Sequence, residues 1–101
     1  PSIAEAVAFA LELTATAATR CVAGKIVEVV NITNEDDVTT TVALAGTYGT
    51  KAVTVAAGTT TSASFTTRAT SIVAHDVTIT ARAADGRTHS STVRVAAATC
   101  G

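Results

Sequence analysis

Apolar and polar residues alternate along this chain in short runs, and this pattern restricts the fold more than any other feature. In an extended strand successive side chains point to opposite faces, so each alternating run presents one apolar and one polar face. Residues that favour turns separate the runs at intervals of roughly 8 to 12 residues. The chain of 101 residues is therefore predicted to be one all-β domain, an immunoglobulin-like or fibronectin III-like antiparallel β-sandwich of about seven strands.

The runs also give approximate strand positions. Residues 1–8 are expected to form a linker or edge segment and residues 9–101 the sandwich. A helical reading of residues 2–13 fits the clean alternation that follows Phe9 less well than a strand does. The expected strands cover residues 9–19, 25–32, 38–44, 51–56, 60–67, 77–83 and 93–97.

Two segments carry strong turn signals. The glycines of "AGTYGT", residues 45–50, suit a hairpin that needs positive φ angles. The sequence "ADGR", residues 84–87, predicts an Asp-Gly hairpin of type I′. Both turns join strands that would be neighbours in an antiparallel sheet.

The two cysteines, Cys21 and Cys100, are predicted to form a disulfide. In an immunoglobulin-like topology the first strand commonly runs parallel to the last, so a cysteine just past each would lie at the same end. The bridge would close a loop of about 80 residues, which the chain-entropy treatment values at roughly 4 to 5 kcal/mol. The apolar residues are mostly Ala and Val, with only Phe9, Tyr48 and Phe65 as aromatic residues, so the core buries little area per residue. A disulfide would therefore add stability that the core alone supplies only weakly.

The disulfide implies an oxidising compartment and hence a secreted protein. The alternatives are a metal half-site or a nucleophile, but His75 and His89 stand far in sequence from either cysteine. Because the chain begins at Pro1 without a basic segment, we expect either a removed signal peptide or, preferably, a domain cut from a longer protein.

Charge and hydropathy exclude two classes of partner. Seven Lys and Arg against eight Asp and Glu give a net charge of −1, with no long block of either sign, so nucleic-acid binding is not expected. Glu5 and Glu12 bracket the most apolar segment, which is too short for a membrane span.

Catalysis is not expected either. Serines could be combined with His75 or His89 and Asp76 or Asp85, but no Gly-x-Ser-x-Gly elbow supports a nucleophile. No cofactor is indicated. These side chains are more simply explained as strand-surface and turn residues.

Several residues are candidates for binding. Sugar rings stack on exposed aromatic faces, which makes Tyr48 a candidate carbohydrate contact, although the simpler interpretation is that it covers its own hairpin or closes the core edge. Lys51, Arg82 and Arg94 could bind acidic sugars, although isolated cations on strands are usually solvated.

The loop "NEDD" offers carboxylates. Asp36 and Asp37 are therefore calcium candidates, against a solvated turn as the simpler interpretation. The segment Asn31 to Thr33 also matches an N-glycosylation acceptor, a match that is common by chance in a Thr-rich chain.

Four segments resemble those of a known group of modules: "LTATAATRCVAGK", "TYGTK", "SFTTRATSI" and "AATCG". They resemble small C-terminal immunoglobulin-like modules appended to secreted actinobacterial enzymes, many of them carbohydrate-active, over residues 11–101. The resemblance implies a disulfide-closed sandwich that acts as spacer, stabiliser or binding partner of a catalytic domain in the same polypeptide.

The chain is thus expected to be a non-catalytic, extracellular accessory module of a multimodular glycoside hydrolase or related polysaccharide-degrading enzyme. One alternative is a carbohydrate-binding module for a soluble or non-crystalline polysaccharide. Bacterial cellulose-binding modules are similar sandwiches, but they stack exposed Trp on cellulose and this chain has no Trp. The other alternative is an adhesion or surface-assembly domain that pairs through a sheet edge.

Overall fold

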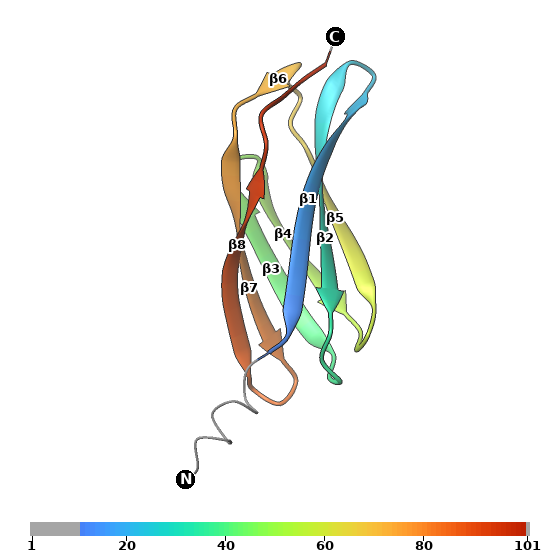
Figure 1. The fold of residues 1–101 in the computed structure, drawn as a ribbon, viewed down its shortest axis with the longest axis vertical. Helices are drawn as coiled ribbons and strands as arrows, with labels where there is room; N and C mark the ends of the chain where they lie inside the picture. Colours follow the sequence, from blue (N-terminus) through green and yellow to red (C-terminus); the bar gives the residue numbers. More distant parts are fainter. Residues whose placement is uncertain (1–10, 101) are drawn as a thin grey trace.

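The computed structural model describes residues 11–100, which form two antiparallel β-sheets packed face to face (Figure 1). Nine strands lie within this range, and their bounds follow the alternating runs of the sequence. They are β1 (Leu13–Val22), β2 (Lys25–Asn34), β3 (Thr40–Gly46), β4 (Gly49–Val55), β5 (Thr60–Thr66), β6 (Ser71–Ile72), β7 (His75–Ala83), β8 (Thr88–Val95) and β9 (Ala98–Thr99).

The strand order confirms the predicted β-sandwich. One sheet has the order β1-β2-β5, the other β4-β3-β7-β8, and the short strands β6 and β9 pair separately. In an immunoglobulin constant-type domain the fourth strand pairs with the fifth. Here β4 pairs with β3 instead, so the order follows the fibronectin III-like form of the predicted sandwich.

The described chain enters at one end of the sandwich and leaves at the other. Leu13 pairs with Asn34 at the end that carries the β2–β3 loop, whereas Cys21 pairs with Ile26 at the opposite end, beside Cys100. Strands β1 and β8 lie side by side and run in the same direction (Figure 1). Both run from the end of Leu11 to the end of Cys100.

The core lies between the sheets and is built mainly from aliphatic side chains. On β2 every second residue is fully buried, and the same period appears on β7, as alternation predicts for strands with one face on a core. Phe65 is the buried aromatic residue of the described range. The buried hydrophobic residues are Leu11, Ile26, Val30, Ile32, Val42, Leu44, Val55, Ala63, Phe65, Ile72, Val77, Ile79, Ala81, Ala83 and Val95.

The first strand differs from the prediction of residues 9–19. It extends to Val22, so Cys21 lies within β1 and not beyond it. The strand continues because the β1–β2 hairpin is closed by two residues, Ala23 at φ 52° and Gly24 at φ 79°. Two central residues with positive φ define a type I′ turn, whose twist matches that of the flanking strands. Residues 1–8, expected to be a linker, and Phe9 lie outside the described range.

The type I′ prediction for residues 84–87 is wrong. Only Gly86, at φ 94°, has a positive φ there, and its N–H donates to the Ala83 carbonyl at 3.0 Å. This is a three-residue loop, a type I turn followed by a left-handed glycine. The glycine supplies the bulge, so Asp85 keeps a negative φ.

The two glycines of the β3–β4 hairpin have different roles. Gly49 takes a positive φ of 132°, whereas Gly46 does not. A Cβ atom on Gly46 would lie 3.1 Å from a methyl carbon of Val77, so close packing against β7 explains this glycine. The prediction of positive φ therefore holds for one of the two.

Strands β6 and β9 were not predicted, because two residues are too few to show alternation. The strand predicted at residues 93–97 is β8, and it begins earlier, at Thr88. Its first five residues are all polar, so their hydropathy gives no sign of a strand. Strand β7 likewise begins at His75, two residues before the predicted start.

Candidate functional site

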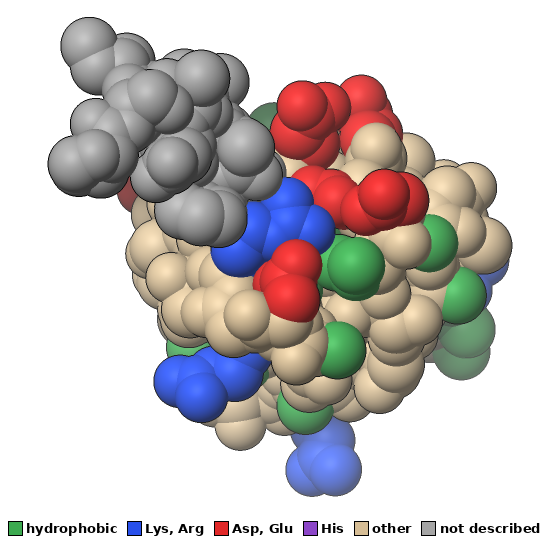
Figure 2. Space-filling view, turned by 90° about the horizontal axis from the view of Figure 1, so that it is seen from below, with side chains coloured by type: hydrophobic (Ala, Val, Ile, Leu, Met, Phe, Trp, Pro, Cys, Tyr) green, Lys and Arg blue, Asp and Glu red, His purple; other side chains and the backbone are tan. Residues whose placement is uncertain are grey.

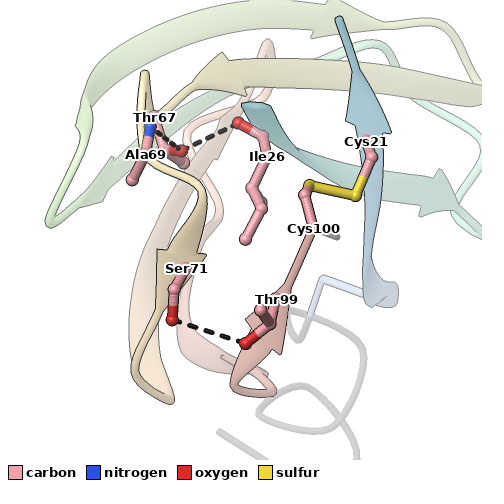
Figure 3. The surroundings of a disulfide bond; sticks show 7 residues. All are labelled: Cys21, Ile26, Thr67, Ala69, Ser71, Thr99 and Cys100. Carbon is pink, nitrogen blue, oxygen red and sulfur yellow. Dashed lines mark hydrogen bonds between the residues drawn. A yellow bond between two sulfur atoms is a disulfide. The ribbon is translucent and has the colours of Figure 1, made fainter. Parts of the chain in front are cut away.

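The disulfide end of the sandwich joins three distant parts of the chain (Figure 3). Cys21 and Cys100 are bonded, with their Cα atoms 5.8 Å apart, and both cysteines of the chain are accounted for. The Cys100 N–H donates to the Thr70 carbonyl at 2.7 Å, and β9 pairs with β6. The predicted disulfide is present, and it ties the end of the described chain to β1.

Next to this end, a carboxyl group and an imidazole meet in the interior. Nε2 of His75 on β7 lies 2.6 Å from Oε2 of Glu28 on β2, with side chains only 10% and 2% exposed. Neither atom has another hydrogen-bond partner within residues 11–100. The Tyr48 ring stands edge-on to the His75 ring, with centroids 5.4 Å apart, and closes the site from the β3–β4 turn.

Both nitrogens of His75 are engaged within the domain. Nδ1 lies 2.9 Å from the Val73 carbonyl, which can only accept, so Nδ1 carries a proton. Nε2 faces Glu28, and burial raises the pKa of that carboxyl while His75 partly opposes the shift. A histidine held in this way has no free nitrogen for a substrate or metal ion.

The opposite end of the sandwich carries a partly buried ion-pair network. Arg87 donates to both carboxylate oxygens of Asp36, at 3.0 and 3.1 Å, and through Nε to Asp85 at 2.8 Å. Figure 2 looks onto this end and shows acidic side chains gathered beside a basic one. The Asp37 backbone N–H and then Arg87 hold the pKa of Asp36 down, at about 2.

This network bears on the calcium candidates. Both oxygens of Asp36 already face the Arg87 guanidinium, and a positive charge in that position repels a second cation. Asp37 contributes its backbone N–H to Asp36 at 2.8 Å. Within residues 11–100 no group of three or more His, Cys, Asp or Glu side chains could hold a metal ion.

The four candidate sugar contacts do not form one patch. Arg94 pairs with Asp76 at 3.2 Å on the outer face of β8 and β7, near the disulfide end. Arg82 lies on the same face, opposite Thr88, six strand positions or roughly 20 Å away. Tyr48 packs on His75, and Lys51 places Nζ 5.8 Å from the centroid of the Phe65 ring.

Arg82 does line a shallow hollow on the outer face of the four-stranded sheet. The hollow measures about 400 Å³, and its other lining residues carry small side chains, three of them hydroxyls. These residues are Thr41, Ala43, Thr80, Ala81 and Thr88. Hydroxyl and guanidinium groups can hydrogen-bond a sugar, although no aromatic side chain lines the hollow.

In the acceptor triplet, Asn31 and Thr33 lie on the outer face of the three-stranded sheet. Asn31 accepts a hydrogen bond from the Ser62 hydroxyl, and Thr33 is 2.8 Å from the Thr60 hydroxyl. Both side chains therefore engage the neighbouring strand β5. These contacts stabilise the pairing of β2 with β5. They account for Asn31 and Thr33 at these positions without any glycosylation.

Two side-chain contacts were not predicted from the sequence: Glu28 with His75 and Asp36 with Arg87. The one signal in the sequence is Glu28 itself, a lone carboxylate within the apolar, β-branched run "KIVEVVNI".

Comparison with protein-family profiles, characterised proteins and solved structures finds no match to this chain. No helix within residues 11–100 is long and apolar enough to cross a membrane.

Proposed function

We propose that this chain is a non-catalytic, extracellular accessory module of a multimodular secreted glycoside hydrolase or related polysaccharide-degrading enzyme. Its role is that of a spacer and stabiliser, and its main partner is the catalytic domain of the same polypeptide. The observation that carries the spacer role is the position of Leu13 and Cys21 at opposite ends of β1. Eight strand positions separate them, roughly 27 Å of extended backbone.

Two further features support this proposal. The cross-link between Cys21 and Cys100 suits a compartment in which disulfides persist. The buried His75 has both nitrogens engaged inside the domain, which argues against a role in general acid–base catalysis. The resemblance of residues 11–101 to modules of secreted actinobacterial enzymes supplies the class of the parent protein.

The hollow beside Arg82 favours one second candidate, a module that binds a soluble polysaccharide. Arg82 and three threonines are among the residues that line one concave surface there, although most of that surface is apolar. The polar groups of these residues fit an acidic or hydroxyl-rich sugar better than a crystalline one, which needs a flat aromatic platform. In this role Arg82 is the main contact, and Tyr48, already packed on His75, is secondary.

The full open reading frame tests the accessory role directly. We expect it to encode a secretion signal and a polysaccharide-degrading catalytic domain, and a reading frame without such a domain overturns the proposal. Affinity electrophoresis through xylan, arabinan, pectin and β-glucan separates the two candidates. Unchanged mobility supports the spacer, whereas retardation that Arg82→Ala abolishes and Tyr48→Ala retains supports binding at the hollow.

A further inference from the structure

We propose that the disulfide and β1 together form a load-bearing path that makes the domain an inextensible link in a longer chain. When such a chain is pulled from both sides, tension enters near Leu11 and leaves near Cys100, at opposite ends of the sandwich (Figure 1). The shortest covalent route between these points runs along β1 to Cys21 and across the sulfur bridge to Cys100. Residues 22–99 lie outside this route.

The bypassed segment makes up most of the domain. Cys21 and Cys100 are 79 positions apart, and strands β2 to β9 all lie between them. Tension cannot lengthen this segment while the bridge is intact, because both of its ends are fixed within 5.8 Å of each other. The force-bearing part of the fold is reduced to one strand and one cross-link.

The strand in the path has little slack. A β-strand already rises about 3.3 Å per residue, and a fully extended chain reaches at most about 3.6 Å per residue. The path from Leu11 to Cys21 can therefore lengthen by only a few Å. Ten register pairs with β2 hold β1 along its whole length, so it is also kept in place on the sheet.

The other end of the path is fixed as well. The Cys100 N–H donates to the Thr70 carbonyl at 2.7 Å, and Thr99 and Ser71 pair across β9 and β6 (Figure 3). These contacts seat Cys100 beside β1, yet they carry no tension while the sulfur bridge is closed. The weakest elements of the fold, its two-residue strands, are thus protected from load.

This inference deepens the proposed spacer role, but its geometry does not depend on the identity of the parent enzyme. A spacer in an enzyme anchored to a solid substrate is pulled whenever the catalytic domain moves. A link that keeps its length under tension holds the two sides of the chain at a fixed separation. The small Ala- and Val-rich core then does not have to resist the force itself.

Single-molecule pulling of the whole chain between handles fused to its two ends tests the proposal. In the oxidised protein we expect residues 11–100 to lengthen by less than about 10 Å at any force that leaves covalent bonds intact. After reduction with dithiothreitol the released segment should add on the order of 260 Å to the extended length. The double variant Cys21→Ser, Cys100→Ser should show the long extension without reductant.

A lengthening step of the larger size in the oxidised, mass-verified protein overturns the proposal. The test does not require the double variant to fold, because it compares the fully extended length of the oxidised protein with that of the reduced protein and of the variant. It is also separate from the test of the accessory role, since the open reading frame can lack a hydrolase while the path carries load. Equally, a hydrolase can be present while the oxidised domain extends.

Discussion

The Glu28 carboxyl and the His75 imidazole face each other between the two sheets. Their facing atoms are 2.6 Å apart, and Nδ1 of His75 is committed to the Val73 carbonyl. A deprotonated Glu28 opposite a neutral His75 would place a carboxylate against a ring lone pair. A hydrogen bond between the two facing atoms therefore needs a proton on one of them.

The raised pKa of Glu28 predicts that stability falls as the pH rises above about 4.3. In the unfolded chain a glutamate loses its proton near pH 4.3. Burial raises the pKa of Glu28 in the folded protein, so its stabilising contribution is present below that pH and is lost as the pH rises through the folded value. Guanidinium unfolding curves measured from about pH 4 to 8 should show this decline.

Glu28→Gln should flatten that slope, because a glutamine amide can donate to Nε2 without an extra proton. Among residues 11–100, β1 and β5 place Thr19 and Phe65 beside Glu28, and Tyr48 is an ionisable side chain in contact with His75. Lys51 covers the Phe65 ring, and Asp76 pairs with Arg94 on the outer face. Asp76→Asn is thus the control, and equal slopes for wild type and Glu28→Gln would contradict the raised pKa of Glu28.

The Asp36–Arg87 pair predicts a separate effect in acid. A pKa lowered to about 2 means that ionised Asp36 stabilises the fold above about pH 4 and that this stabilisation is lost as the pH falls from 4 to 2. Asp36→Asn should lower the melting temperature at pH 7 and weaken its decline between pH 4 and 2. Asp37→Asn removes the adjacent charge and leaves the pair intact. If both variants follow the wild-type acid profile, the pair makes no contribution.

Asn34 should be among the polar residues least tolerant of change. Its side chain is fully buried, donates to the Val38 and Val55 carbonyls at 2.7 and 3.1 Å, and accepts from the Asp36 N–H. Asn34→Ala leaves these buried groups without partners, at a cost of about 2 to 4 kcal/mol in urea unfolding. Asn31→Ala, on the outer face of the same strand, should cost less than about 1 kcal/mol. Similar losses for the two would contradict the assignment.

Ala23 offers a stabilising substitution. A left-handed conformation costs an L-residue with a Cβ atom roughly 1 kcal/mol, and Asn tolerates it better than Ala. Ala23→Asn should therefore raise the free energy of unfolding by about 0.5 to 1 kcal/mol in thermal or urea unfolding. Ala45→Asn, at an exposed position within β3, should bring no gain. A loss of stability in Ala23→Asn would mean that the turn is not of type I′.

Much of the sandwich could be predicted from the sequence, because alternation records which face of a strand meets the core. On β3, β5 and β7 the apolar residues of the alternating runs, among them Val42, Phe65 and Ile79, are the buried ones. Strand β8 was only half recognised, since its first residues are polar on both faces. Its pairing with β7 depends on backbone hydrogen bonds that any sequence can make.

The interior pairs could not be predicted in the same way. Glu28 meets His75 only because β2 and β7 belong to opposite sheets, and Asp36 meets Arg87 across 51 positions. Alternation along one strand contains no information on which residue of the other sheet it faces. The prediction of a type I′ turn at residues 84–87 failed for a related reason, because the number of residues in a loop depends on where both flanking strands stop.

The 79-position bridge also decides what a single peptide-bond cleavage does to this domain. A cut at any exposed loop between the cysteines, such as the one that carries Val73 at 77% exposure, leaves both fragments joined through sulfur. The ladders between β2, β3, β5, β7 and β8 still hold the pieces in register. A domain closed in this way tolerates a single protease cleavage without separating into two fragments.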